Sequence, residues 1–203
     1  MGRTFLANDA TTDSKLAIKA LYPSRLADWK DLELFQREAA VLERIDHPLV
    51  PRYIDSFHEG DGDAVCYFLA QTWVEGQTLR EVLRGARRFE EADLVALLRD
   101  MLDVLKTIHG LETPAIHRDI KPENIILRSS DGRPSLVDFG AVREVVRLTM
   151  RGGSTIVGSF GYMSPEQLMG RAIPATDIYG LGITMVECLT REGRIPKWLC
   201  TGG

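Results

Sequence analysis

Short blocks of apolar residues alternate with polar turns over the first part of the chain. Residues 4–7 and 16–21 are rich in apolar residues and flank a polar segment, which predicts a β-hairpin. Residues 53–57 and 65–71 flank an acidic turn that contains glycine, and they predict a second hairpin. We therefore expect strands to dominate this part of the chain.

The segment between the two hairpins, residues 26–45, has the apolar spacing of an α-helix. Phe35, Leu42 and Ile45 fall on one stripe of that helix. Glu38 falls on the same stripe, and a carboxylate on a buried face needs a partner. The sequence therefore predicts one amphipathic helix with an inward-facing acid.

Helical patterns dominate after Gly76, which interrupts the strand pattern. Residues 78–83 and 91–109 have helical spacing. Residues 178–189 form the most apolar segment of the chain, but a membrane span needs roughly 18 or more apolar residues. We therefore expect a buried helix there and no membrane span in this chain.

The order of these elements is strands with one helix, followed mainly by helices. This order predicts an α+β fold in two lobes that join near residues 73–76. We assign residues 1–75 to the first lobe and residues 76–203 to the second. With 203 residues and 44% hydrophobic content, the chain is long enough to bury a core.

Charge and cysteine content narrow the choice of partners and compartment. The formal net charge is −4 and no dense basic stripe occurs, which argues against a nucleic-acid partner. Cys66, Cys188 and Cys200 are widely spaced and form no Cys-x-x-Cys pattern. Such cysteines are typical of reduced thiols in the cytoplasm rather than of a disulfide framework.

The chemistry of the chain is concentrated in two short segments. Residues 117–124 are His-Arg-Asp-Ile-Lys-Pro-Glu-Asn, and residues 138–140 are Asp-Phe-Gly. Together they supply a base, a cation and two metal-binding side chains, which is the set that phosphoryl transfer needs. A capped turn explains any one of these polar residues but not the whole set. The chain therefore resembles a protein kinase, and Lys121, two residues after Asp119, is typical of the Ser/Thr type.

The resemblance implies a role for each polar residue of these segments. Asp119 is expected to accept the proton of the attacking hydroxyl, and Lys121 to neutralise charge on the transferred phosphoryl group. Asn124 and Asp138 are expected to hold Mg²⁺ through oxygen ligands. ATP and Mg²⁺ are thus the expected cofactors, and Ser or Thr hydroxyls of proteins are the expected acceptors.

The resemblance also extends to the first lobe. Lys19, in Ala17-Ile18-Lys19, matches the strand lysine that contacts the α- and β-phosphates of the nucleotide. By itself Lys19 is better explained as an exposed strand lysine. Glu38 lies nineteen residues further on, at the separation of the family's lysine–glutamate ion pair.

A nucleotide-binding cleft is expected from the same resemblance. Adenine is expected to lie between Ala17 and Ile126, with its edge against the backbone of residues 72–74 and with Gln71 at the gatekeeper position. Gly2 and Thr4 match the last glycine of the glycine-rich loop and the Val position after it. The expected nucleotide-binding residues are therefore Gly2, Thr4, Ala17, Lys19, Glu38, Gln71, Thr72, Val74 and Ile126.

Several further positions match supporting parts of a kinase. Ser159 matches the residue that hydrogen-bonds the base and the lysine, and Asp177 matches the buried aspartate that holds the catalytic loop. Arg118 is expected to pair with a phosphorylated activation segment, which makes Thr149, Ser154 and Thr155 candidate autophosphorylation sites. Four residues match the stack that connects the lobes of active kinases: Leu42, Tyr53, His117 and Phe139.

The pattern departs from a complete kinase domain at both ends. The first glycines and the first strand are expected before Met1, and only twenty-six residues follow Asp177. Glu166, in Ser-Pro-Glu where the family usually has Ala-Pro-Glu, is expected to lack its usual arginine partner. We therefore expect a fragment or a truncated product of a kinase-like bilobal fold, similar to bacterial kinases of the eukaryotic type.

Two alternatives to a protein kinase stay open at this point. The chain could be an inactive, pseudokinase-like module that binds nucleotide or a partner without transfer. It could also be a small-molecule kinase of the aminoglycoside type, although such enzymes typically lack both His-Arg-Asp-x-Lys-Pro and the Ser-Pro-Glu segment.

Overall fold

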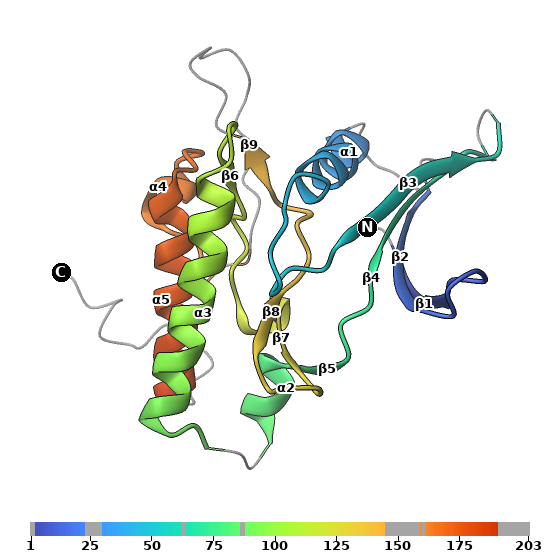
Figure 1. The fold of residues 1–203 in the computed structure, drawn as a ribbon. Helices are drawn as coiled ribbons and strands as arrows, with labels where there is room; N and C mark the ends of the chain where they lie inside the picture. The colour runs from blue at the N-terminus through green and yellow to red at the C-terminus, as the bar shows by residue number, and fades with distance from the viewer. Residues whose placement is uncertain are drawn as a thin grey trace.

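A computed structural model describes residues 3–22, 30–61, 64–85, 88–144, 159 and 161–190. These residues form an antiparallel sheet with one helix beside it, followed by a mainly helical part with two small sheets (Figure 1). The α+β class and the order of elements expected from the sequence are confirmed.

The N-terminal sheet has four strands in the order β1-β2-β4-β3, and every neighbouring pair is antiparallel. Both predicted hairpins are present, as β1 with β2 and β3 with β4. The short polar side chain of Asp9 shapes the first turn, because its Oδ1 accepts hydrogen bonds from the backbone of Thr11 and Thr12. The strands are β1 (Arg3–Asn8), β2 (Lys15–Leu21), β3 (Tyr53–Glu59) and β4 (Cys66–Thr72).

The helix predicted at residues 26–45 is α1 (Lys30–Leu42), which ends three residues earlier than predicted; residues 26–29 lie outside the described ranges. Phe35, Leu42 and Ile45 are buried as their spacing predicts, and Ile45 lies just beyond the end of the helix. Glu38 is buried on the same side with only 2% of its surface exposed. The inward-facing acid predicted from the sequence is therefore confirmed.

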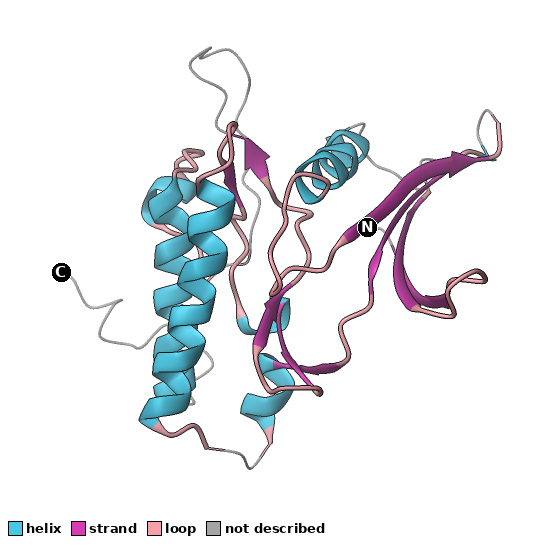
Figure 2. Cartoon of the chain, in the orientation of Figure 1, coloured by secondary structure: helices cyan, strands magenta, loops and turns pink. Residues whose placement is uncertain are grey.

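The rest of the chain is built around two long helices, α3 and α5, which lie side by side (Figure 2). The predicted helix at 91–109 is confirmed at both ends, and the apolar segment 178–189 lies within α5. The predicted helix at 78–83 begins one residue later, because Thr78 caps it through a capping box with Glu81. The helices are α2 (Leu79–Arg84), α3 (Glu91–His109), α4 (Pro165–Leu168) and α5 (Pro174–Thr190).

Short strands connect the long helices and carry the loops of the site. The order β5-β7-β8 forms one small sheet, and β6 pairs with β9. A 3₁₀ turn, Pro122–Asn124, leads directly into β7. The strands are β5 (Gly76–Thr78), β6 (Ala115–Ile116), β7 (Ile125–Arg128), β8 (Pro134–Leu136) and β9 (Arg143–Glu144).

The loop after α1 attaches the sheet part to the helical part. The Leu49 carbonyl accepts hydrogen bonds from the Leu136 backbone N–H at 2.9 Å and from Ser135 Oγ at 3.1 Å. The Pro48 carbonyl accepts a hydrogen bond from Arg128 at 2.8 Å. Buried side chains of both parts form one continuous apolar core. This attachment sets where α1, and with it Glu38, lies relative to β7 and β8.

None of the helices in the described ranges has the length and apolar content needed to cross a membrane.

Candidate active site

A cleft of about 750 Å³ lies between the sheet part and the helical part. It brings together residues from β1, β2, α1, β4, β7 and residues 117–124, the segment that matches the catalytic loop of kinases. All the candidate site residues expected from the sequence line this cleft except Gly2, which lies outside the described residues. They are Thr4, Ala17, Lys19, Glu38, Gln71, Thr72, Val74, Asp119, Lys121, Asn124, Ile126 and Asp138.

One lysine and two carboxylates form an ion cluster in the cleft. Lys19 Nζ lies 2.6 Å from Glu38 Oε2 and 3.0 Å from Asp138 Oδ1. Burial by itself lowers the pKa of Lys19, but the charges of Glu38 and Asp138 outweigh it and raise this pKa above its usual value. Burial likewise opposes ionisation of Asp138, and Lys19 overcomes it and lowers the pKa of Asp138. Lys19 and Asp138 therefore favour each other's charged forms, whereas burial raises the pKa of Glu38 despite the ammonium beside it.

The glycine after Phe139 leaves room for this cluster. A Cβ atom on Gly140 would lie 3.0 Å from Lys19 Nζ and 3.1 Å from Asp138 Oδ1. The backbone N–H of Gly140 also donates a hydrogen bond to Asp138 Oδ1. Asp138 itself has a φ of 62°, a left-handed conformation that is uncommon outside glycine. The Asp-Phe-Gly segment thus turns sharply and aims the Asp138 carboxylate at Lys19.

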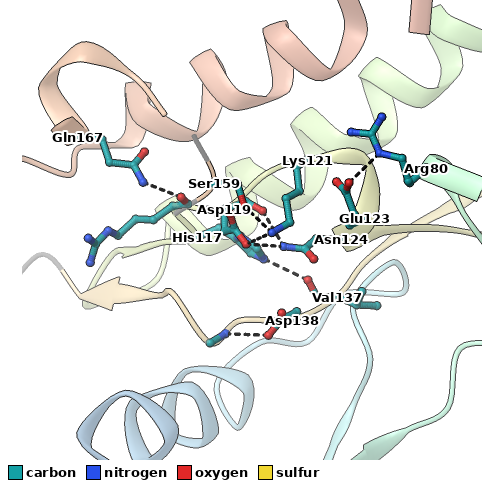
Figure 3. A network of polar contacts seen from close by, with 12 residues as sticks. Arg80, His117, Asp119, Lys121, Glu123, Asn124, Val137, Asp138, Ser159 and Gln167 are labelled. Carbon is teal, nitrogen blue, oxygen red and sulfur yellow. Dashed lines mark hydrogen bonds and ion pairs between the residues drawn. The ribbon is translucent and has the colours of Figure 1, made fainter. Parts of the chain in front are cut away.

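The catalytic loop holds a second polar cluster, shown in Figure 3. Asp119 Oδ2 accepts hydrogen bonds from Lys121 Nζ at 2.7 Å and from Asn124 Nδ2 at 3.0 Å. Lys121 Nζ also donates to Ser159 Oγ at 2.6 Å, which is the lysine contact expected for Ser159; the expected contact with Asp119 is absent among the described residues. Asp119 Oδ1 is buried and accepts no hydrogen bond from the residues that the structure describes. One oxygen of this carboxylate is therefore fixed by two donors while the other keeps its acceptor capacity.

Asp177 anchors the start of the catalytic loop, as the sequence predicts. Its carboxylate accepts hydrogen bonds from the backbone N–H groups of His117 at 2.9 Å and Arg118 at 2.8 Å. His109 Nε2 lies 2.8 Å from the same carboxylate. The sequence analysis did not identify His109, although its place at the end of a strongly periodic helix marks it as the polar residue of the last turn.

The stack expected between the lobes is present in part as direct contacts. The His117 and Phe139 rings meet edge to face with centroids 4.7 Å apart, and both side chains are buried. Leu42 is buried in the common core and Tyr53 packs against it at the edge. These residues therefore link α1, β3 and the two loops of the site.

An arginine-centred cluster beside the catalytic loop was missed by the sequence analysis. Arg80, on α2, donates hydrogen bonds to Glu123 Oε1 at 2.7 Å, to the Tyr162 hydroxyl at 2.6 Å and to Glu187. The Tyr162 hydroxyl also donates to Glu187. Burial, followed by the hydrogen bond to Glu187, raises the pKa of Tyr162 well above its usual value. Glu187 could have indicated this cluster from the sequence, because a carboxylate inside an apolar helix needs a cation as its partner.

Two expectations about the later segment have different outcomes. Glu166 has a local hydrogen-bond partner, because its Oε1 accepts from Thr176 Oγ1 at 3.2 Å. A hydrogen bond from Ser164 contributes most to lowering the pKa of Glu166. The candidate phosphorylation sites Thr149, Ser154 and Thr155 lie outside the described residues.

Comparison with known proteins agrees with this geometry. The model of the protein kinase domain family matches residues 1–197. Serine/threonine-protein kinase C of Synechocystis sp. is 38% identical over 98% of this chain, and PknA of Nostoc sp. is 36% identical over 98%. PrkC of Bacillus subtilis is 32% identical over 97%.

The chain therefore belongs to the protein kinase domain family, and these relatives are all bacterial serine/threonine-protein kinases. It spans 38%, 36% and 29% of the length of these three relatives.

Proposed function

We propose that this chain transfers the γ-phosphoryl group of ATP to Ser or Thr hydroxyls of proteins. This proposal rests mainly on the Asp119 carboxylate, in which only one of the two oxygens accepts hydrogen bonds from the described residues. Lys121 and Asn124 fix its Oδ2, and its Oδ1 is left to accept the proton of an incoming hydroxyl. Family membership and the names of the relatives support the same reaction.

Lys121 is placed to stabilise charge during the transfer. Its ammonium group lies 2.7 Å from Asp119 Oδ2 and can reach a phosphoryl oxygen beside the attacking hydroxyl. Ser159 holds this ammonium from the other side, so that Lys121 is oriented before the substrate binds. Phosphoryl transfer depends mainly on such positioning and charge stabilisation.

The other end of the cleft suits the nucleotide. Ala17, Gln71, Thr72, Val74 and Ile126 all line the cleft. Lys19 is held by Glu38 with its ammonium in the cleft, where it can contact the α- and β-phosphates. Thr4 lies in the same cleft, and we propose these residues as the nucleotide site.

Asn124 and Asp138 fit a magnesium ion by the chemistry of their donor atoms. Asn124 Nδ2 is committed to the Asp119 carbonyl and carboxylate, which leaves the amide oxygen as the free ligand. Asp138 contributes a half-exposed carboxylate. Mg²⁺ is commonly bound by one or two such oxygen ligands together with phosphates. The ion would neutralise negative charge on the phosphates when bound.

Four further points stand as proposals beside the reaction. The boundary between the two lobes lies between residues 75 and 76. This boundary is supported by β4, the last strand of the first sheet, which ends at Thr72, and by β5, which pairs with β7 of the second part. Thr149, Ser154 or Thr155 receives phosphate from the chain itself.

The protein acts in the cytoplasm, which the free thiols of Cys66 and Cys188 support. Catalysis is preferred over an inactive module because Lys19, Asp119 and Asp138 face one cleft.

The test is intact-mass analysis after incubation of the 203-residue chain with Mg²⁺ and ATP, beside an Asp119→Asn variant. We expect mass gains in steps of about 80 Da, one phosphate per hydroxyl, in the parent only. A parallel assay offers Ser, Thr and Tyr peptides, and separately sugars and aminoglycosides. Equal gains in parent and variant, or ATP turnover only with the small molecules, would contradict the proposal.

A further inference from the structure

Two elements from the later part of the chain hold the backbone at Arg118. Arg118 has a φ of 70°, which a non-glycine residue rarely adopts unless its surroundings impose it. Its backbone N–H donates to Asp177 Oδ1 at 2.8 Å. Its carbonyl accepts a hydrogen bond from Gln167 Nε2 at 2.7 Å, a contact drawn in Figure 3. Asp177 lies on α5 and Gln167 on α4, so two separate helices fix one residue.

The Arg118 carbonyl belongs to the same planar peptide unit as the backbone N–H of Asp119. That N–H donates to His117 Nδ1 at 3.3 Å. The peptide that presents Asp119 is thus held at its carbonyl end by Gln167 and at its N–H end by the His117 ring. A rotation of this peptide plane moves the Asp119 carboxylate in the cleft.

Gln167 is well placed to control that rotation. Its side chain is buried with 2% of its surface exposed, and its backbone N–H donates to the capping hydroxyl of Ser164 at 3.3 Å. The same stretch of chain supplies Ser159, which holds Lys121. The segment that ends in α4 therefore contacts the catalytic loop at two points, on either side of Asp119.

We propose that Gln167 is a positioning residue for phosphoryl transfer. Its amide fixes the Arg118–Asp119 peptide, and through it the orientation of the Asp119 carboxylate, and so links the placement of α4 to the base. This inference rests on the transfer activity proposed above. The glutamine was not identified from the sequence, where it is one polar residue of a short helix.

Two substitutions separate hydrogen bonding from space filling. Gln167→Met keeps the length of the side chain but removes the donor, which leaves the buried Arg118 carbonyl without this partner. Gln167→Glu keeps the shape, but the carboxyl group donates to a carbonyl only while it is protonated. Burial raises the pKa of a carboxyl group introduced there, so the donor is recovered as the pH falls. Gln77→Met, at an exposed position of β5, is the matched control.

The experiment combines steady-state kinetics with hydrogen exchange of residues 115–121 in the full chain. We expect Gln167→Met to lower kcat about tenfold while KM for ATP stays within a factor of two, because Lys19 and Asp138 are untouched. Amide exchange in residues 115–121 should accelerate by a similar factor. Gln167→Glu should recover kcat relative to Gln167→Met as the pH is lowered, and Gln77→Met should match the parent.

The outcomes distinguish this inference from the proposed function. Unchanged kcat and unchanged exchange in Gln167→Met would overturn the inference. A variant that loses ATP affinity and melting temperature along with kcat would overturn it too, because that result indicates a general packing role. A pH-independent kcat ratio between the glutamate and methionine variants would overturn it as well. If the parent chain transfers no phosphate, the proposed transfer is refuted. If amide exchange is nevertheless faster in Gln167→Met than in the parent, the link between Gln167 and the Asp119 peptide is supported.

Discussion

Replacing Lys19 by methionine leaves the carboxylate of Glu38 buried without the cation that faces it. Glu38 is 2% exposed, and Lys19 Nζ lies 2.6 Å from its Oε2. Methionine has a similar length and no charge, so the packing of the stem is kept. The Asp138 carboxylate then acts on Glu38 without a compensating ammonium, and burial and this like charge both raise the pKa of Glu38.

The cost to stability follows from the buried charge and depends on pH. Breaking a buried ion pair by removing one partner costs about 3–5 kcal/mol. A carboxyl group whose pKa is higher in the folded state destabilises that state as the pH rises above the unfolded value of about 4.3. Each pH unit between the unfolded and folded pKa values then removes about 1.4 kcal/mol. Below that window Glu38 is protonated in both states and the penalty disappears.

The assay is urea unfolding of three chains at pH 5, 6 and 7: the parent, Lys19→Met, and the double variant Lys19→Met with Glu38→Gln. We expect the single variant to lose stability relative to the double variant as the pH rises, by up to about 1.4 kcal/mol per pH unit. The double variant should be the more stable of the two at pH 7, because it buries no unpaired charge. Parallel pH profiles for the single and double variants would refute the argument.

Three further changes test other contacts of the site. Gly140→Ala brings a Cβ atom to 3.0 Å from the lysine of the ion cluster and should weaken ATP binding about tenfold, measured by titration with the nucleotide. Arg80→Met leaves Glu187 buried without its cation and should lower the free energy of unfolding by about 3 kcal/mol, most of it regained when Glu187→Gln is added. Gly180→Ala brings a Cβ atom to 3.1 Å from the Ile120 carbonyl and should lower kcat several-fold while ATP affinity, measured by titration, is kept.

The elements of the chain were predictable because they depend on neighbouring residues. Alternating apolar blocks around polar turns predicted both hairpins, and the spacing over residues 91–109 predicted α3 at both ends. The stripe that contains Phe35 and Glu38 predicted which face of α1 is buried. The start of α2 was off by one residue because the cap, and not the periodicity, decides where that helix begins.

Most of the candidate site was also predictable, because its residues form dense local motifs. Asp119, Lys121 and Asn124 lie within six consecutive positions, so the sequence already places their side chains close together. The separation between Lys19 and Glu38 pointed to a pairing only through the resemblance to kinases. The roles of these residues in transfer stay predictions until the assays above are done.

The sequence by itself determined the class of fold, the faces of its helices and the local motifs, since these follow from periodicity and short-range hydrogen bonding. The tertiary structure alone decided that Lys19 meets Asp138, that His109 supports Asp177 and that Gln167 reaches the Arg118 carbonyl. These pairs are separated by 119, 68 and 49 positions. No local pattern encodes such contacts, because they depend on how whole elements pack against one another and on the few tenths of an ångström that a hydrogen bond tolerates.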